Sequence, residues 1–156
     1  RNYSDPHRGG KTGNLNSFLR ICYYSIDYII GYFVKVKSVT RITRVVVFDR
    51  YFTDIICDSR RSRIYLSPKF LYRWGKFFIP TLDYNILLTA SSETILARKR
   101  ELDEEGINTI NAKIDYLAGK KAYTKVLNET TPQAAVYEIL NHVFNEQHRK
   151  NLRRLK

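Results

Sequence analysis

The sequence predicts an α/β fold in which helices flank a parallel sheet. Helical and strand-like segments alternate along the chain, and the strand candidates are short apolar runs without polar alternation. Such runs suit strands that are covered on both faces, as in a parallel sheet. No internal repeat, low-complexity segment or linker divides the chain, so we expect residues 1–156 to form a single domain.

The chain begins with a predicted loop and a long helix. Three glycines and a proline interrupt any regular pattern over residues 1–13. Apolar residues then recur at helical spacing over residues 15–37, which predicts an amphipathic helix with Asn14 or Asn16 as its N-cap. This apolar set comprises Leu15, Leu19, Cys22, Ile26, Ile29, Ile30 and Phe33.

A strand and a short helix are expected next. The β-branched run at residues 45–48 predicts a strand that ends at Asp49. A short helix is predicted over residues 69–78, with Pro68 at its start and Pro80 after its end. The segment between them carries a basic cluster: Arg60, Arg61 and Arg63.

Two further strands and three helices are expected after Pro80. Residues 84–88 predict a strand, and Ser91 or Ser92 can cap the helix that follows it. A charged segment then leads to a helix predicted over residues 107–118.

The last strand candidate, residues 123–127, precedes the closing helix. Thr131 can cap this helix, with Pro132 at its first position. Five apolar residues are expected on one of its faces: Ala135, Val136, Ile139, Leu140 and Val143.

The composition favours an anionic partner and a reducing compartment. The net charge is +12, which suits nucleotides, nucleic acid or an acidic membrane surface. The two cysteines have no CxxC spacing, and residues 1–12 do not resemble a signal peptide. The most apolar stretch, residues 21–36, is interrupted by Asp27 and is short for a membrane span. We therefore expect a cytoplasmic protein without a membrane segment.

Asp49, Arg50 and Tyr51 directly follow the first predicted strand, where parallel sheets bind ligands. A carboxylate there can order a magnesium ion, and an adjacent arginine can bind a phosphate through two parallel hydrogen bonds. An ion pair at the end of the sheet is the alternative interpretation of the same residues.

Three consecutive cations, Arg98, Lys99 and Arg100, end the helix that follows the second predicted strand. Phosphoryl transfer needs positive charge around the transferring group, often on a mobile segment. Alternatively, these cations complement the negative end of the helix or pair with the acidic residues after it.

The order and spacing of three motifs resemble those of the thymidylate kinase family. The motifs are V-V-V-F-D-R-Y at residues 45–51, I-P-T-L-D-Y-N-I-L-L-T-A-S-S-E at residues 79–93 and A-R-K-R-E-L at residues 97–102. The resemblance implies a three-layer P-loop kinase fold and ATP-dependent phosphorylation of a nucleoside monophosphate, with dTMP as the first expected acceptor. ATP and Mg²⁺ are the implied cofactors, and a homodimer is an implied assembly.

The resemblance also implies roles for individual residues. Asp49 would organise Mg²⁺ and the acceptor, Arg50 would hold the acceptor phosphate and Tyr51 would line the acceptor pocket. The lid arginines that stabilise the transferring group would be Arg98 and Arg100. Tyr116 would lie near the acceptor nucleoside. The loop with Asn128 and Glu129 would pass near the adenine of ATP. Arg98 would also contact ATP.

The chain departs from the family in the phosphate-binding loop. The family motif is G-x-x-x-x-G-K-[ST], but Gly10, Lys11 and Thr12 are preceded by Asp5 where the first glycine should stand. We therefore expect the donor-phosphate loop and its strand to be absent, and the chain as written to be inactive. The lack of any methionine adds the expectation that the sequence is not the whole gene product.

Three alternatives remain open at this point. The first is a phosphotransferase of the same fold that acts on another small acceptor. The second is a non-catalytic basic module that binds nucleic acid through the Arg60–Arg63 cluster and the basic tail at residues 148–156, although no recognition motif supports it. The third is association with a membrane surface.

Overall fold

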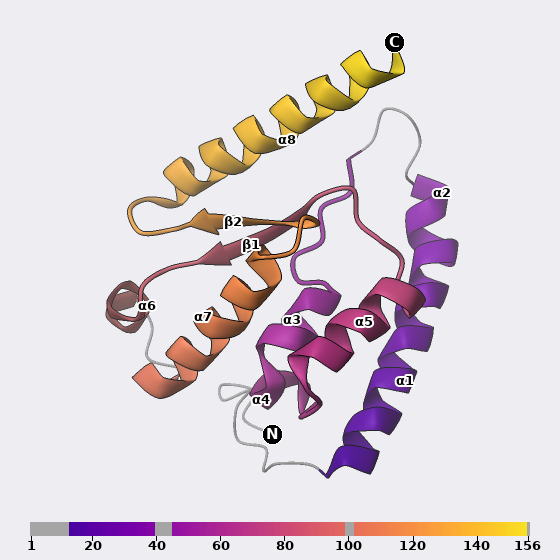
Figure 1. Cartoon of the computed structure of the whole chain (residues 1–156), viewed down its shortest axis with the longest axis vertical. Helices are drawn as coiled ribbons and strands as arrows, with labels where there is room; N and C mark the ends of the chain where they lie inside the picture. The colour runs from indigo at the N-terminus through magenta and orange to yellow at the C-terminus, as the bar shows by residue number, and fades with distance from the viewer. Residues whose placement is uncertain (1–12, 40–44, 99–101, 156) are drawn as a thin grey trace. The chain divides into compact units, whose positions relative to one another are not determined.

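The computed structural model describes residues 13–39, 45–98 and 102–155 (Figure 1). The chain divides into two compact units, which we call unit 1 (Arg1–Thr81) and unit 2 (Leu82–Lys156). The described part of unit 1 is helical, whereas unit 2 combines helices with a parallel sheet. The mixed α/β class predicted from the sequence is confirmed at this level, and the single domain stays a prediction.

Unit 1 is built around a long N-terminal helix. α1 (Asn14–Gly31) continues through a π-helical turn, η1 (Tyr32–Val36), into the short α2 (Lys37–Val39), which confirms the long helix expected here. Its N-cap is Gly13, not Asn14 or Asn16, and no side chain caps the helix. Gly13 has the extended backbone of an N-cap, and its carbonyl accepts the first helical hydrogen bond from Ser17 N at 3.0 Å.

The face of α1 that unit 1 buries is partly polar. Ser17, Ile21 and Ser25 are buried, and both serines have partners outside the helix. Ser17 Oγ accepts a hydrogen bond from Tyr65 N at 3.2 Å, and Trp74 Nε1 donates to Ser25 Oγ at 2.8 Å. Most of the apolar residues that predicted the helix are exposed instead: Leu15, Leu19, Ile26, Ile30 and Phe33.

The core of unit 1 lies between three shorter helices that follow α1. Pro68 opens the longest of them as predicted, and Ser67 Oγ caps it by accepting from Phe70 N at 3.2 Å. The other two helices were not predicted, because their short sequences do not show a helical period. The three helices are α3 (Phe52–Cys57), α4 (Ser59–Ser62) and α5 (Pro68–Phe78).

The run at residues 45–48 does not form the predicted strand. It has no regular structure and pairs with no strand among the described residues. Val45 and Val47 are 89% and 84% exposed. A strand needs a neighbour that satisfies its backbone groups, so β-branched residues alone do not form one.

Unit 2 contains a parallel pair of strands joined by two helices. β1 (Asn85–Thr89) pairs with β2 (Tyr123–Leu127) in a register that sets Asn85 beside Tyr123 and Thr89 beside Leu127. Both strands were predicted to within one residue. The crossover contains α6 (Ser92–Arg98) and α7 (Glu104–Ala118), and α8 (Pro132–Arg154) closes the chain.

Helices cover both faces of this sheet (Figure 1). Neighbouring residues of a strand point to opposite faces. Lys125 of β2 forms an ion pair with Asp115 of α7, whereas Thr124 shares a hydrogen bond with His142 of α8 at 2.9 Å. Unit 2 is therefore a local helix–sheet–helix arrangement, with α7 on one face and α8 on the other.

Capping side chains set where the helices of unit 2 begin. The predicted caps Ser91 and Thr131 accept hydrogen bonds from Thr94 N and Ala134 N, at 3.2 and 3.3 Å. Asp103 caps α7 in the same way, so this helix starts three residues earlier than the apolar spacing predicted.

The apolar residues expected on one face of α8 are divided. Ala135 is buried, but Val136 and Leu140 are about half exposed. In the part of the chain that the structure describes, no helix has the length and apolar character of a membrane span.

Candidate functional site

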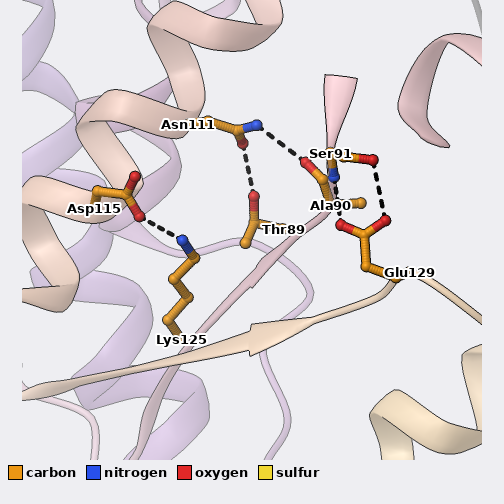
Figure 2. A network of polar contacts seen from close by, with 7 residues as sticks. All are labelled: Thr89, Ala90, Ser91, Asn111, Asp115, Lys125 and Glu129. Carbon is orange, nitrogen blue, oxygen red and sulfur yellow. Dashed lines mark hydrogen bonds and ion pairs between the residues drawn. The ribbon is translucent and has the colours of Figure 1, made fainter. Parts of the chain in front are cut away.

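In unit 2, polar side chains converge beyond the carboxyl ends of β1 and β2 (Figure 2). The carboxylate of Glu129 accepts hydrogen bonds from Ser91 N at 2.6 Å, from Ser91 Oγ at 3.1 Å and from Thr94 Oγ1 at 2.7 Å. These donors, the Thr94 hydroxyl first, lower the pKa of Glu129. The ionised side chain thus ties the loop after β2 to the N-terminus of α6.

Arg98 holds the same loop from the other end of α6. Its Nη1 donates to the carbonyl oxygen of Asn128 at 2.8 Å, and its Nη2 donates to the carbonyl oxygen of Thr130 at 3.0 Å. Both terminal nitrogens of the guanidinium therefore have partners in the loop. The three residues that the resemblance placed near ATP, Arg98, Asn128 and Glu129, lie together in unit 2.

Asn111 of α7 orders the end of β1 and was missed by the sequence analysis (Figure 2). Its Oδ1 accepts from Thr89 Oγ1 at 2.6 Å, and its Nδ2 donates to the Ala90 carbonyl at 3.0 Å. Asn128 N donates to the Thr89 carbonyl at 2.8 Å, which joins the two strand ends. A lone asparagine inside a predicted helix gives no sequence signal of such a role.

Asn128 also carries an unused acceptor. Its Oδ1 is buried and has no hydrogen-bond partner among the described residues. Buried polar atoms are normally paired, so this unpaired oxygen is an uncommon feature of the loop.

Tyr116 lies on the same helix as Asn111. It lies half-buried on α7, and the ammonium of Lys120 stands 4.6 Å from the centre of its ring. The aromatic face is therefore occupied by a cation. Its suggested role near the acceptor nucleoside stays a prediction.

Unit 1 holds the other predicted group, Asp49, Arg50 and Tyr51. Arg50 has a φ of 75°, in the left-handed region that is rare for residues other than glycine. Such a conformation costs about 1–3 kcal/mol and is concentrated at functional sites. Asp49 is exposed beside it.

Arg50 approaches Asp54, a residue that the sequence analysis did not single out. Arg50 Nη1 and Asp54 Oδ2 are 3.9 Å apart, and both side chains are more than one third exposed. Burial raises the pKa of Asp54, and the Arg50 guanidinium opposes this rise. The pair is loose, so the guanidinium can turn to a phosphate at little energetic cost.

Tyr51 is fixed by a hydrogen bond and by neighbouring rings. Its hydroxyl donates to the Pro80 carbonyl at 2.7 Å, and its ring centre lies 4.9 Å from that of Tyr28 and 5.1 Å from that of Phe48. Tyr28 also contacts Phe52 edge to face. These rings form an aromatic wall beside Arg50. Tyr51 is the one ring among them that was singled out from the sequence as a site residue.

The described residues contain no group of three or more potential metal ligands from His, Cys, Asp and Glu. This does not conflict with the expected Mg²⁺, because that ion is often held by one or two carboxylates together with nucleotide phosphates and waters. The exposed carboxylate of Asp49 fits such a site. Arg100, the second expected lid arginine, lies outside the described residues.

Two cations of the basic tail have partners within unit 2. Arg149 pairs with Glu146 at 3.2 Å, and the ammonium of Lys150 stands 4.4 Å from the ring centre of Tyr84. The Tyr84 hydroxyl donates to Gln147 at 2.8 Å, which holds the same turn of α8. These contacts help to hold α8 against the start of β1.

The chain was compared with protein-family models, with curated proteins and with solved structures, and nothing matched.

Proposed function

We propose that this chain belongs to an ATP-dependent kinase that phosphorylates a nucleoside monophosphate, with dTMP as its acceptor. The observation that carries the proposal is the loop at residues 128–130, which Arg98 and Glu129 hold at the carboxyl ends of two parallel strands. Ligands of α/β sheets bind beyond these ends. The order of the three motifs supports phosphoryl transfer as the chemistry at this end of the sheet.

The donor side of the site is assigned to unit 2. Arg98 acts mainly by positioning the loop, because its guanidinium donates to two loop carbonyls. The adenine of ATP would lie against this loop, next to the backbone that Arg98 holds. Glu129 keeps the loop closed against α6 and does not contact the phosphates.

The acceptor side is assigned to unit 1. The Arg50 guanidinium binds the monophosphate through two parallel hydrogen bonds, and its backbone has the left-handed φ that is common at functional sites. Tyr51 and Tyr28 provide a rigid aromatic wall for the nucleoside. No covalent intermediate is needed, because positioning and electrostatic stabilisation carry most of phosphoryl transfer.

Mg²⁺ bound with ATP would supply positive charge that offsets the charge of the donor phosphates. In this proposal Asp49 would hold that ion directly or through a water, and Arg98 and Arg100 would add positive charge near the transferring group. The sequence contains no complete G-x-x-x-x-G-K-[ST] segment for the donor phosphates. Binding, which does not need turnover, is therefore the sharper test for this chain.

The three-layer P-loop kinase fold is also part of the proposal. Residues 45–48 would join the parallel sheet as a further strand, which would cover the exposed side chains of Val45 and Val47. Hydrogen exchange with bound nucleotide would show slower exchange at these four amides. Unchanged exchange in a nucleotide-saturated sample would contradict this strand.

The experiment that tests the function is a calorimetric titration of the chain with a panel of nucleotides. We expect dTMP to bind more tightly than AMP, CMP, GMP and UMP, and ATP to bind at a separate site without displacing dTMP. A preference for another monophosphate would favour the alternative acceptor within the same fold. Binding of mixed-sequence DNA that falls steeply with salt, without nucleotide binding, would replace the proposal by the nucleic-acid module.

A further inference from the structure

Unit 1 contains a segment in which cations are interleaved with aromatic rings and acids are missing. Between Asp58 and Asp83 the sequence has six Lys or Arg residues and six aromatic residues, but no Asp or Glu. Proteins that bind single-stranded nucleic acid combine these two residue types, because cations contact phosphates and rings stack on bases. The longest helix of this segment is α5 (Figure 1).

Three cations form a row on the outward face of α5. Lys69, Arg73 and Lys76 follow one another by four and three residues, so they lie on one side of the helix within about 10 Å along its axis. All three are exposed, and none has an ion pair among the residues that the structure describes. Arg60 and Arg63, in contrast, interact with other groups of the protein. A polyanion can therefore approach the row on α5 without breaking an ion pair.

Aromatic rings stand beside this row. Phe77 lies about one turn after Arg73 on the helix surface and is 79% exposed. Phe70 and Phe78 are also exposed, and both contact Trp74, with ring centres 5.8 and 4.5 Å from that of the indole. Grouped exposed apolar side chains on a soluble protein mark a binding surface more often than single ones do.

The aromatic group is held in place by the rest of unit 1. Trp74 Nε1 donates to Ser25 Oγ of α1 at 2.8 Å, and the Trp74 ring meets Phe18 of α1 edge to face. Leu71 is the residue of α5 that is buried, and it anchors the helix to the core. The rings are therefore presented by a fixed helix, which lowers the entropic cost of stacking a base on them.

A single strand fits this face better than a duplex or a membrane. The exposed apolar residues of α5 are all phenylalanines, and stacking on bases requires rings, whereas insertion into lipid is served equally by aliphatic side chains. In a duplex the faces of the bases are already stacked on one another, so the rings would gain nothing. A mononucleotide has too few phosphates to engage the whole row.

We propose that the outward face of α5 binds single-stranded nucleic acid, with the cation row along its phosphates and Phe77 stacked on a base. The proposal does not depend on the phosphotransfer function, because it uses none of the residues assigned to ATP or to the acceptor. It implies little sequence preference, since every base has a face that can stack.

Fluorescence anisotropy of a labelled oligothymidylate of about 20 nucleotides, titrated with the full chain, tests the proposal. The logarithm of the association constant should fall with the logarithm of the salt concentration with a slope of about −2, as expected for three phosphate contacts on a single strand. A duplex of the same length should bind about tenfold more weakly, because it offers no base for stacking. The unlabelled strand should quench the emission of Trp74, which is the one tryptophan of the chain.

Two variants separate stacking from charge. Phe77→Ala should weaken binding about tenfold at an unchanged salt slope, because it removes one stacked base. Arg73→Ala should weaken binding and reduce the steepness of the slope by about 0.7, because it removes one phosphate contact. Phe144→Ala and Arg153→Ala are the matched controls on α8, where both side chains are exposed, and should bind as the wild type does. Circular dichroism would verify that all four variants keep their helix content.

Four results would each overturn the proposal. The first is no binding of the oligonucleotide at low salt. The second is its displacement by saturating dTMP or ATP, which would place it in a mononucleotide site. The third is an equal loss of affinity in the α8 controls. The fourth is an unchanged oligonucleotide affinity in Phe77→Ala together with weaker sedimentation of this variant with phosphatidylserine vesicles, which would assign the face to a membrane surface.

Discussion

At the scale of single residues, tyrosines beside Arg50 titrate far from their ordinary range. Burial raises the pKa of Tyr28 to about 12, and the carboxylates of Asp54 and Asp27 add to the rise. Burial raises the pKa of Tyr51 to about 12 as well, with smaller effects from Tyr28 and Tyr32. Both hydroxyls therefore stay neutral throughout the physiological range, so they can only act as hydrogen-bonding and packing groups.

These shifts predict how stability changes at high pH. Below the ordinary pKa of 10, both tyrosines keep their protons in the folded and unfolded states and give no pH dependence. Between pH 10 and 12 the unfolded state releases protons first, so the free energy of unfolding falls as pH rises. Chemical denaturation at several pH values should show this fall, and Tyr28→Phe should reduce it. An equal fall in the wild type and in Tyr28→Phe would mean that the pKa of Tyr28 is not raised in the folded protein.

Arg98 gives the second prediction at this scale. Arg98→Ala removes both hydrogen bonds to the loop carbonyls, so amide exchange at residues 128–131 should become at least tenfold faster and ATP binding should weaken. Arg149→Ala, which removes an exposed arginine with a surface ion pair in the same unit, is the control. Faster exchange without any loss of ATP affinity would show that this loop does not contribute to ATP binding.

At the scale of elements, α3 and α5 meet at a glycine. A Cβ atom at Gly75 would lie 2.6 Å from Cε1 of Phe52, whose side chain is buried. Nothing lies within 4 Å of the corresponding position at Gly31 in α1. The same substitution should therefore have opposite effects at these two helical glycines.

We expect Gly75→Ala to destabilise unit 1 by about 1–3 kcal/mol, because the added methyl overpacks the contact with Phe52. Gly31→Ala should stabilise the protein by about 0.5–1 kcal/mol, since alanine favours the helix and meets no neighbour. Thermal or urea unfolding measures both changes. A stabilising Gly75→Ala would show that α3 and α5 do not pack as closely as described.

The elements that could be predicted are those with strong local signals. Pro68 and Thr131 mark helix starts where the structure places them, and the apolar runs in β1 and β2 were found nearly to the residue. The run at residues 45–48 has the same character, yet strand formation also requires a partner that no local pattern reports. The apolar spacing of α1 predicted the helix but not which of its faces is buried.

The candidate site was predictable only in part, for a related reason. The motif residues Arg98, Asn128 and Glu129 were singled out, but the contacts among them join residues about 30 positions apart. Asn111 and Asp54 gave no signal, because single polar residues in helices are common and their role depends on tertiary packing. Sequence order identified the candidate residues, and the fold supplied their partners.

At the scale of the whole molecule, the proposed function divides between the two units. Unit 1 carries the arginine that we assign to the acceptor phosphate, with its aromatic wall, and unit 2 carries the loop that we assign to ATP. The net charge of +12 favours highly charged anionic ligands for both. The central claim is that Arg50, in its strained conformation, is the group that recognises the acceptor phosphate.

Calorimetric titration of dTMP into the wild type, Arg50→Ala and Arg73→Ala tests this claim most directly. Arg73 is an exposed arginine of α5, so its removal changes the charge of unit 1 equally without touching the proposed site. We predict that Arg50→Ala weakens dTMP binding about 30-fold, which is the loss expected when a charged hydrogen-bonding partner is removed. ATP binding should be unchanged in this variant. Arg73→Ala should bind dTMP as the wild type does. Equal affinities of the two variants for dTMP, or equal losses of dTMP and ATP in Arg50→Ala, would contradict the account.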